Sequence, residues 1–399
     1  MRICLVSGEF PPMQGGVGDF TRELGQAMLD AGHDVLILTS TRSAGPEHRR
    51  GGRVFANVAE WGWSVWRQAA GFFAEQRPDV VNIQYQTAAY GMRPAINLLP
   101  WRMRLHRRRP VLVVTFHDLL IPFLFRGAGP LRRWITDALA RGCDGVIVTN
   151  EEDDAELARR APRTPRRRIP IGANFAAPPA PAGPARQAWR ARWGIGPAQL
   201  ALSYFGFLNQ SKGGEELIEA LGRLVQAGRD VKLLMIGGKV GASDPTNRAY
   251  LARVEAMAQD RGLSDRVIWT DYLPDAEASA TLQASDICVL PYRDGASTRR
   301  GTLMAALAHG LPVVTTEPAV PVAGFRDGEN MLFAPRRDAA ALAATIARLA
   351  DAPALRRQLA AGAAELASQF TWPAIAAETL RFYAELLRDA GAQRSRTRE

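Results

Sequence analysis

Cysteine and lysine are both scarce in this chain of 399 residues. Its three cysteines, Cys4, Cys143 and Cys288, are far apart, and each lies in or beside an apolar run. Their spacing suits neither a disulfide framework nor a zinc site, so we expect reduced core thiols in a cytoplasmic protein. Lysine supplies only three of the 50 basic residues. The positive charge is therefore almost entirely arginine.

Several other signatures are missing. No run of 18 or more apolar residues occurs, which argues against a bilayer-spanning helix. The first residues, RICLVS, read directly as a strand, so we expect no secretory signal. The sequence contains no Walker A loop, G-x-S-x-G elbow or H-E-x-x-H helix, and no carboxylates with the spacing of an acid–base pair. It predicts neither a metal centre nor a bound cofactor.

The formal net charge of +10 is the unusual bulk property. Arginine clusters occur at 102–109 and 159–168. A positive surface attracts nucleic acid, anionic membrane or anionic substrates, but no nucleic-acid module is present and we expect no such partner. Trp101 and the apolar INLLP precede the first cluster, so the segment from Trp101 to Arg109 is a candidate for peripheral contact with an anionic membrane. An ordinary solvated arginine-rich face is the alternative.

Alternating strand and helix patterns predict an α/β protein with two Rossmann-like domains. The first domain is expected at 1–175, a Pro/Ala-rich linker at 176–187 and the second domain at 188–370. A last helix is expected at 373–389, before a basic tail at 390–399 that we expect to be disordered. Buried parallel strands are expected at 2–7, 34–39, 79–84, 111–116 and 144–148, and again at 200–206, 231–236, 266–270, 286–290 and 312–315.

The stretch 294–315 reads as a loop, a short helix and a buried strand. We expect Ser297 or Thr298 to cap the helix, and Arg299 and Arg300 to lie in its first turn. Cations oppose the positive end of a helix dipole. Two arginines at that end therefore indicate that an anion binds there.

The backbone N–H groups of Gly301 and Thr302, flanked by the two guanidinium groups, predict a pocket of diphosphate size. A further cation, Lys212 in YFGFLNQSKGG, falls at the expected start of another helix, where it is unfavourable without an anion. We expect Lys212 to contact phosphate. The alternatives are a solvated helix start, or a salt bridge from Asp294 to the arginines.

In the first domain, a glycine-rich turn follows the first strand. Gly15, Gly16 and Gly18 allow the backbone to approach a ligand at the carboxyl edge of the sheet, although GxGxxG is absent. Glu9 is the acidic residue in a plausible cleft position there. A plain tight turn is the alternative.

His117 and Asp118 leave a buried strand in VLVVTFHDLLIP. A histidine at the carboxyl edge of the sheet is well placed to touch a substrate, with Asp118 in a position to orient it. A structural histidine that caps the turn is the alternative.

These pieces together resemble glycosyltransferase family 4, the retaining sugar transferases of the GT-B fold. The resemblance covers nearly the whole chain, and the shared order and spacing of the motifs make it specific. FTWPAIA resembles the start of a terminal helix that crosses back to the first domain. The other motifs are GEFPPMQGGVGDFTRELGQAMLDAGHDVLILT, NIQYQ, TFHD, RIPIGAN, GFLNQSKGGEELIEAL and DYLPDAEASATLQASDICVLPYRDGAS with ALAHGLPVVTT.

The resemblance implies a nucleotide sugar held by the second domain and an acceptor held by the first, across a cleft. Lys212 matches the lysine of a phosphate clamp, and His117 matches a histidine close to the transferred sugar. The expected catalytic residues are His117, Lys212 and Arg300. The expected donor-binding residues are Gly15, Gly16, Gly18, Gly206, Asn209, Lys212, Ser297, Thr298, Arg299, Arg300, Gly301 and Thr302. The expected acceptor-binding residues are Glu9, Gln84, Tyr85, His117, Asp118 and Asn174.

Two departures from the family pattern concern the donor. Phe207 stands where the clamp arginine should follow Gly206, and Ser297 and Ala305 replace two glutamates that contact the donor sugar and the ribose. Loss of one charge-assisted hydrogen bond costs about 1.5–3 kcal/mol. We expect an altered donor site in which the arginine pair supplies part of the missing attraction.

The resemblance implies a hexosyltransferase that moves a sugar from a nucleotide sugar to a glycan or lipid-linked acceptor. The reaction would retain configuration and need no metal, in glycan, glycolipid or cell-envelope polysaccharide synthesis. The protein would be cytoplasmic, with a peripheral position on the inner face of the membrane. One alternative is a GT-B protein that binds a sugar nucleotide or glycan without transfer. Another is a sugar-nucleotide epimerase.

Overall fold

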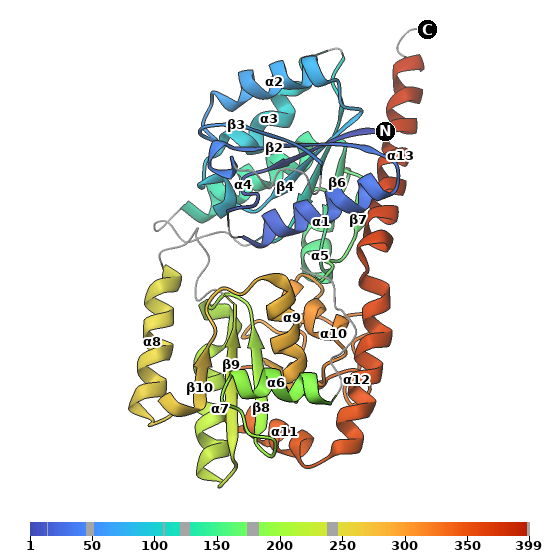
Figure 1. The fold of residues 1–399 in the computed structure, drawn as a ribbon. Helices are drawn as coiled ribbons and strands as arrows, with labels where there is room; N and C mark the ends of the chain where they lie inside the picture. The colour runs from blue at the N-terminus through green and yellow to red at the C-terminus, as the bar shows by residue number, and fades with distance from the viewer. Residues whose placement is uncertain are drawn as a thin grey trace. The chain divides into compact units, whose positions relative to one another are not determined.

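The computed structural model describes residues 1–13, 15–44, 52–106, 108–119, 128–173, 183–237 and 246–396. The chain divides into two compact units. Unit 1 comprises Met1–Gly172 with Trp372–Glu399, and unit 2 comprises Ala173–Thr371. Each unit is an α/β layer structure built on its own parallel sheet (Figure 1). In the described part of the chain, no helix has the length and hydropathy needed to span a bilayer.

The sheet of unit 1 has seven strands in the order β3-β2-β1-β4-β5-β6-β7, and all neighbours pair in parallel. From β1 the chain first adds β2 and β3 on one side and then β4 to β7 on the other. The order of strand addition therefore switches sides between β1 and β4. The carboxyl ends of these strands form the edge where doubly wound sheets bind ligands. The strands are β1 (Arg2–Ser7), β2 (Asp34–Ser40), β3 (Arg53–Val58), β4 (Val80–Tyr85), β5 (Val111–Phe116), β6 (Gly145–Val148) and β7 (Arg166–Arg168).

Helices cover both faces of this sheet, as its two separate hydrophobic clusters require. The helices are α1 (Gly16–Asp30), α2 (Val65–Gln76), α3 (Ala95–Met103), α4 (Ala128–Gly142), α5 (Glu151–Arg160) and α13 (Trp372–Arg396). Although α13 is last in the sequence, it packs against α1 and β5 (Figure 1). Asn82 of β4 connects the sheet to α13, because its Nδ2 donates to the Tyr383 hydroxyl at 2.6 Å.

Unit 2 has a six-stranded parallel sheet in the order β10-β9-β8-β11-β12-β13. Its strands are β8 (Leu200–Phe205), β9 (Val231–Ile236), β10 (Val267–Trp269), β11 (Ile287–Leu290), β12 (Val313–Thr316) and β13 (Leu332–Ala334). Its helices are α6 (Pro184–Arg192), α7 (Gly214–Gln226), α8 (Thr246–Asp260), α9 (Asp275–Ala284), α10 (Gly301–Ala308), α11 (Ala339–Ala350) and α12 (Pro353–Ala367). The order of strand addition switches sides between β8 and β11, and ligands of such sheets bind beside the loops that follow these two strands.

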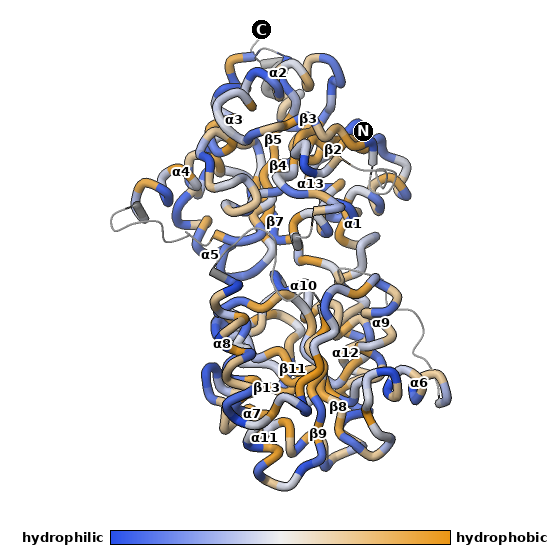
Figure 2. Tube along the Cα trace, turned by 60° about the vertical axis from the view of Figure 1, so that its left-hand side comes forward, coloured by the Kyte–Doolittle hydropathy of each residue, from blue (hydrophilic) through white to orange (hydrophobic). Residues whose placement is uncertain are grey.

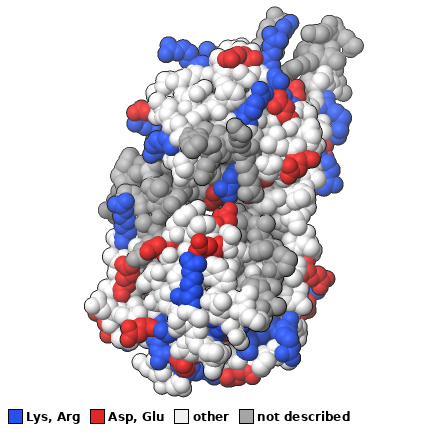
Figure 3. Space-filling model, in the orientation of Figure 1, with Lys and Arg blue, Asp and Glu red and all other residues white. Residues whose placement is uncertain are grey.

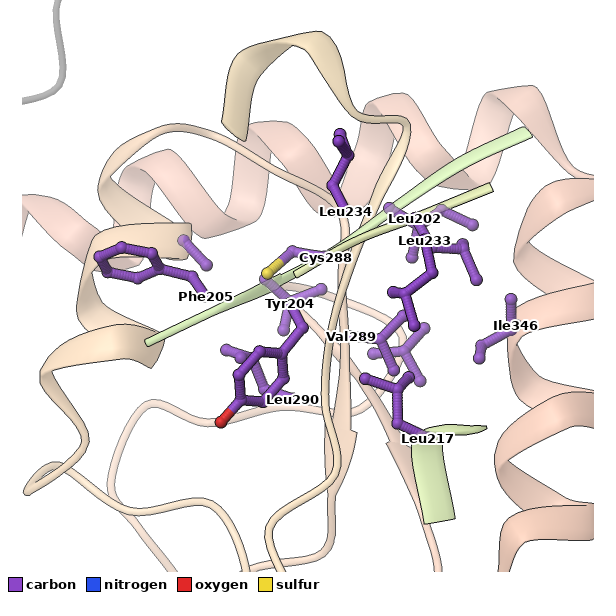
Figure 4. Packing of buried hydrophobic residues seen from close by; sticks show 14 of the residues in the cluster. Leu202, Tyr204, Phe205, Leu217, Leu233, Leu234, Cys288, Val289, Leu290 and Ile346 are labelled. Atoms are coloured by element: carbon purple, nitrogen blue, oxygen red, sulfur yellow. The ribbon is translucent and has the colours of Figure 1, made fainter. Parts of the chain in front are cut away.

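The core of unit 2 is continuous around its central strands. The most hydrophobic segments of the tube include β8 and β11 (Figure 2). Leu202 of β8 and Leu233 of β9 lie beside Leu217 of α7 and Ile346 of α11 (Figure 4). These side chains are fully buried, which fixes the strand ends that carry the candidate site.

Helices were expected from the sequence near 18–31, 60–76, 94–107 and 131–141 in the first domain, and at 212–226, 246–261, 299–308 and 338–349 in the second. Six elements of the structure were not expected: β3, α5, β7, α6, α9 and β13. The clearest case is β7, which is three arginines and has no hydrophobic signature. It forms because it pairs with β6 while its side chains reach carboxylates, for example Arg167 with Glu378 and Glu385 at 2.6 Å each. Tertiary contacts here override the local pattern.

Two helices extend into segments for which the sequence predicted no regular structure. Helix α6 begins at Pro184, inside the expected linker 176–187, because proline suits the first turn of a helix. Helix α13 continues to Arg396, beyond the expected start of a disordered tail at 390, because alanine, glutamine and arginine favour helix.

Candidate functional site

Three segments of unit 2 meet where β8 ends. Gly206 follows β8 with φ of +110°, in the region that favours glycine. A Cβ at Gly206 would lie 2.5 Å from Cγ2 of Thr302 and 3.2 Å from Nζ of Lys212. The Lys212 ammonium group and the Thr302 side chain in the first turn of α10 therefore both border the space that a side chain at Gly206 would fill. Sequence analysis predicted these three residues as donor-binding, and the structure brings them together.

Lys212 does not start α7 as expected. It ends a short 3₁₀ turn, Gln210–Lys212, whereas α7 begins at Gly214. The turn is held by Asn209, whose Oδ1 accepts hydrogen bonds from the backbone N and Oγ of Ser211 at 3.1 and 2.8 Å. Asn209 therefore positions the lysine and has its side-chain oxygen occupied.

The surroundings of the half-buried Lys212 disfavour the charged form of its amino group. Burial first, and then the positive charge of Arg300, lower its pKa to about 7. In the described part of the chain, no carboxylate lies within 4.0 Å of Lys212 Nζ. Two cations side by side form the electrostatic signature of a site that an anion completes.

The arginine pair lies just before α10, not in its first turn. Arg300 occupies the N-cap position and makes no side-chain capping bond, so the expectation that Ser297 or Thr298 caps this helix is wrong. Asp294 binds both guanidinium groups: its Oδ2 lies 2.7 Å from Arg299 Nη2, and its Oδ1 accepts from Arg300 Nη2. The alternative of a salt bridge from Asp294 is thus confirmed. It leaves the Arg300 Nε buried without a hydrogen-bond partner.

The ring of Tyr292, which sequence reasoning missed, completes this corner. The Arg300 guanidinium carbon lies 4.7 Å from the centre of the Tyr292 ring, and the Tyr292 hydroxyl lies 2.7 Å from Thr302 Oγ1. Tyr292 therefore fixes both neighbours. Tyr292 is the second residue after β11, at the point where the order of strand addition switches sides. That position is the signal that could have identified it.

Two positions that carry glutamates in the family pattern are uncharged and enclosed here. The Ser297 hydroxyl is buried without a hydrogen-bond partner, and Ala305 is fully buried in the core of unit 2. Ser297 thus presents an unused polar group near the arginines. The methyl side chain of Ala305 offers no polar group to a donor.

In unit 1, Glu9 caps the helix that follows the glycine turn. The Val17 backbone N donates to Glu9 Oε1 at 3.1 Å, and burial raises the pKa of the Glu9 carboxyl while the Val17 and Gly18 N–H groups oppose the shift. A Cβ at Gly15 would lie 2.1 Å from Glu9 Oε1, whereas a Cβ at Gly16 would meet nothing within 4 Å. The carboxylate therefore occupies the start of α1, and only Gly16 leaves open space.

His117 and Gln84 lie together on the face of the unit 1 sheet that α1 and α13 cover. His117 Nε2 lies 3.0 Å from Gln84 Oε1, and the imidazole packs edge-on against Phe20 at 4.6 Å between ring centres. Burial lowers the pKa of His117 to about 3, so the ring is neutral. Gln84 Nε2 is buried without a partner. Trp372 contacts Phe20 at 5.2 Å and completes this group.

The remaining expected acceptor residues are dispersed. Asp118 Oδ2 accepts from Gln86 Nε2 at 2.9 Å. Tyr85 points into the core on the opposite face of the sheet from Gln84, where it packs against Tyr90 and Phe116. These two expected acceptor-binding side chains therefore lie on opposite faces of the sheet, as neighbouring residues of a strand do. Asn174 lies outside the described residues.

No group of three or more metal-ligating side chains occurs among the described residues. Cations, hydroxyls and backbone N–H groups supply the polar chemistry of the unit 2 corner. The histidine corner of unit 1 supplies a neutral ring and an amide. The first arrangement is suited to anions and the second to neutral hydroxyl groups.

Two family models match the chain. Residues 14–176 match the model described as Glycosyltransferase Family 4, and residues 199–352 match the model described as Glycosyl transferases group 1. The D-inositol 3-phosphate glycosyltransferase of Streptomyces bingchenggensis is 27% identical over 254 residues, which is 63% of this chain and 55% of that relative. The match thus spans little more than half of the relative.

Solved structures share the fold over nearly the full length. Sucrose-phosphate synthase from Thermosynechococcus elongatus has a TM-score of 0.79 and 23% identity, covering 98% of this chain and 100% of that chain. Anabaena HepE, solved in complex with UDP-glucose, has a TM-score of 0.76 and 19% identity, covering 96% and 99%. These similarities identify a GT-B fold. The two family models show in addition that the chain is similar to glycosyltransferases of family 4 over residues 14–176 and of group 1 over residues 199–352.

Proposed function

We propose that the chain transfers a sugar from a nucleoside diphosphate sugar to an acceptor hydroxyl. The observation that carries this proposal is the convergence of Lys212, Arg300 and Thr302 around Gly206 at the carboxyl end of β8. Ligands of open α/β sheets bind at this edge. The UDP-glucose complex of a protein with the same fold supports a uridine, or another nucleoside, diphosphate sugar as the donor class.

Unit 2 binds the donor in this proposal. As the bond to the anomeric carbon breaks, negative charge grows on the leaving diphosphate. The Lys212 ammonium, the Arg300 guanidinium and the first N–H groups of α10 stabilise that charge. The anion also relieves the repulsion between the two cations, so bound diphosphate raises the pKa of Lys212. These cations perform the charge neutralisation for which other transferases use a metal ion.

Unit 1 binds the acceptor. The neutral His117 ring and the unpartnered amide of Gln84 provide one acceptor and one donor for a sugar hydroxyl. His117 places the hydroxyl, and the leaving phosphate takes its proton on the same face, which gives net retention. The retained configuration comes from the family resemblance.

The acceptor class we propose is a glycan or lipid-linked sugar, in glycan, glycolipid or cell-envelope polysaccharide synthesis on the cytoplasmic side of a membrane. The segment from Trp101 to Arg109 supports peripheral contact with that membrane. Trp101 at the end of α3 is 44% exposed and Leu105 is 76% exposed, next to a series of arginines. Exposed tryptophan and leucine beside cations are typical of interfacial segments.

A non-catalytic sugar-nucleotide or glycan binding protein is the second candidate. It is favoured by Ser297 and Ala305, which offer no charge where the family pattern has two glutamates. Weaker contacts to the sugar and the ribose lower the rate of transfer more than they lower the affinity for the diphosphate. The two candidates therefore differ in turnover and not in nucleotide affinity.

The experiment incubates the purified protein with radiolabelled UDP-, GDP- and ADP-sugars, with and without glycan and lipid-linked acceptors. Transfer to an acceptor that falls at least about tenfold in Lys212→Ala and is retained in Lys232→Ala supports the transferase. Lys232 is a suitable control because its Nζ binds the Asp265 carbonyl, at the opposite edge of the unit 2 sheet. Tight nucleotide binding without transfer or hydrolysis across the panel would favour the binding protein.

A further inference from the structure

Unit 1 also contains a basic hollow, away from His117. It has a cavity volume of about 840 Å³ and lies among the carboxyl ends of α3, α4 and α5 and the last turns of α13. Asp144 and Pro165, which line it, directly precede β6 and β7. The hollow is therefore at the amino edge of the sheet, whereas His117 follows the carboxyl end of β5.

Four arginines line the hollow: Arg104, Arg141, Arg160 and Arg163. Arg160 is paired, with Nη2 2.6 Å from Asp137 and Nη1 2.6 Å from Glu156. Among the described residues, no carboxylate lies within 4.0 Å of the other three.

Two of these arginines use part of their hydrogen-bonding capacity on helix ends. Arg104 Nη2 donates to the Arg141 carbonyl at 3.3 Å, and Arg141 Nη2 donates to the Arg160 carbonyl at 2.7 Å. Such bonds neutralise carbonyl groups that a helix end leaves unsatisfied. Each guanidinium has five N–H groups, so several donors remain on each. The side chain of Arg163 is exposed and adds a full charge at the mouth of the hollow.

The acidic groups of the hollow do not cancel this charge. Asp144 is held by Arg109 at 2.5 and 2.8 Å, outside the four arginines, and also accepts the Leu112 backbone N–H at 2.8 Å. Asp389 is exposed on α13. Among the charged residues that line the hollow, four are arginines and two are aspartates.

One wall of the hollow is rigid and continues into an apolar rim. Trp101 Nε1 donates to the Ala138 carbonyl at 2.7 Å, and the Arg104 guanidinium carbon lies 5.0 Å from the indole centre. A Cβ at Gly142 would lie 2.7 Å from Trp101 Nε1, so the indole sits directly on the end of α4. Leu105, beside Arg104 in the chain, is 76% exposed.

We propose that this hollow binds a phosphoryl anion, and that the phosphate belongs to the headgroup of an anionic membrane lipid. Guanidinium groups match phosphate oxygens by paired N–H donation, and the exposed Trp101 and Leu105 enter the interface beside the bound headgroup. The inference rests on the proposed membrane contact for the source of the phosphate. It is independent of the transfer reaction.

The test measures sedimentation of the full chain with vesicles of phosphatidylcholine containing phosphatidylglycerol. Arg163→Glu is compared with Arg159→Glu, an equal charge change at an exposed position on the last turn of α5 that does not line the hollow. General attraction to the membrane falls in both variants. Specific binding predicts that Arg163→Glu loses about tenfold more vesicle affinity than Arg159→Glu, a ratio typical of one charge-assisted contact.

A second arm separates lipid from soluble phosphate. Inorganic phosphate and pyrophosphate are titrated while the melting temperature is followed. A rise in the wild type that is absent in Arg163→Glu, without vesicle binding, assigns the hollow to a soluble phosphate. Equal vesicle affinity of the two variants, or no response to either vesicles or phosphate, overturns the proposal. Transfer to a soluble acceptor serves as the control for folding and is expected to be unchanged in both variants.

Discussion

Lys212 is the residue to which we assign the main contact with the donor phosphates. It is one of three lysines in the chain and lies close to Arg300, without a carboxylate partner among the described residues. We expect Lys212→Ala to lower kcat/KM by about 10- to 150-fold, the range for a lost charge-assisted contact of about 1.5–3 kcal/mol. Steady-state kinetics with the best donor measure this. Lys232→Ala should stay within about twofold, as expected for a surface change. Equal kcat/KM in wild type and Lys212→Ala would remove the lysine from the site.

The protonation of Lys212 should also make donor binding depend on pH. Its pKa is lowered to about 7, so in the free protein the side chain is charged below that pH and neutral above it. The diphosphate favours the charged form and raises the pKa. We therefore expect UDP affinity to fall as pH rises from about 7.5 to 9, a range in which the terminal phosphate of UDP is already almost fully ionised.

Calorimetry in two buffers of different ionisation enthalpy tests this directly. At pH 8 the wild type should take up a proton on binding UDP, whereas Lys212→Ala should not. Proton uptake of the same size in both proteins would place the titrating group elsewhere.

Arg300 is expected to replace the clamp arginine that is missing at Phe207. We predict that Arg300→Ala weakens UDP binding by about 10-fold or more, and that Phe207→Ala changes it by less than about threefold. Isothermal titration gives both values, and thermal unfolding checks that each variant is folded. Negligible effects of both changes would exclude Arg300 from the donor site.

The sequence predicted the residues of this corner better than their arrangement. Gly206 and Lys212 were identified because a glycine after a buried strand and a cation near a helix start are both typical of phosphate sites. The start of α10 was misplaced because Asp294 binds both arginines and holds them before the helix, a tertiary contact that local capping rules do not contain. Tyr292 was missed because an aromatic residue after a strand looks like ordinary core.

At the scale of elements, α13 joins unit 1 through a buried hydrogen bond. Tyr383→Phe would leave an Asn82 N–H without its partner in the sheet, at a cost of about 1–3 kcal/mol. We expect denaturant unfolding of unit 1 to shift accordingly while UDP affinity in unit 2 is unchanged. Tyr272→Phe is the control, since Tyr272 is 60% exposed. Equal midpoints for the two variants would mean that the bond adds nothing to stability.

Elements with a regular apolar pattern were predictable, and those stabilised by charge were not. The buried strand β5 matched its expected bounds 111–116 because all its residues are apolar or small. By contrast, α5 begins EEDD and ends RR, which suits the helix dipole but lacks an apolar stripe. Its formation depends on the Asn150 cap, whose Oδ1 accepts the Asp153 N–H at 2.9 Å, and on ion pairs with neighbouring segments.

At the scale of the whole molecule, composition indicated two α/β units because strand and helix patterns repeat on both sides of the proline-rich segment. The +10 charge gave no such guidance. Many arginines of the described residues pair with carboxylates, for example Arg229 with Asp351, and the face drawn in Figure 3 carries both basic and acidic side chains. Net charge therefore does not locate a site. The geometry of a few arginines and one lysine does so.

The most direct test of the central claim is a crystal structure of the protein with UDP. We predict that the diphosphate lies at the carboxyl end of β8, with oxygens at about 2.7–3.0 Å from Lys212 Nζ and from an Arg300 guanidinium nitrogen. Backbone N–H groups of Gly301 or Thr302 should also donate to it. Nucleotide bound elsewhere, or bound here with Lys212 and Arg300 turned away from the phosphates, would contradict the account.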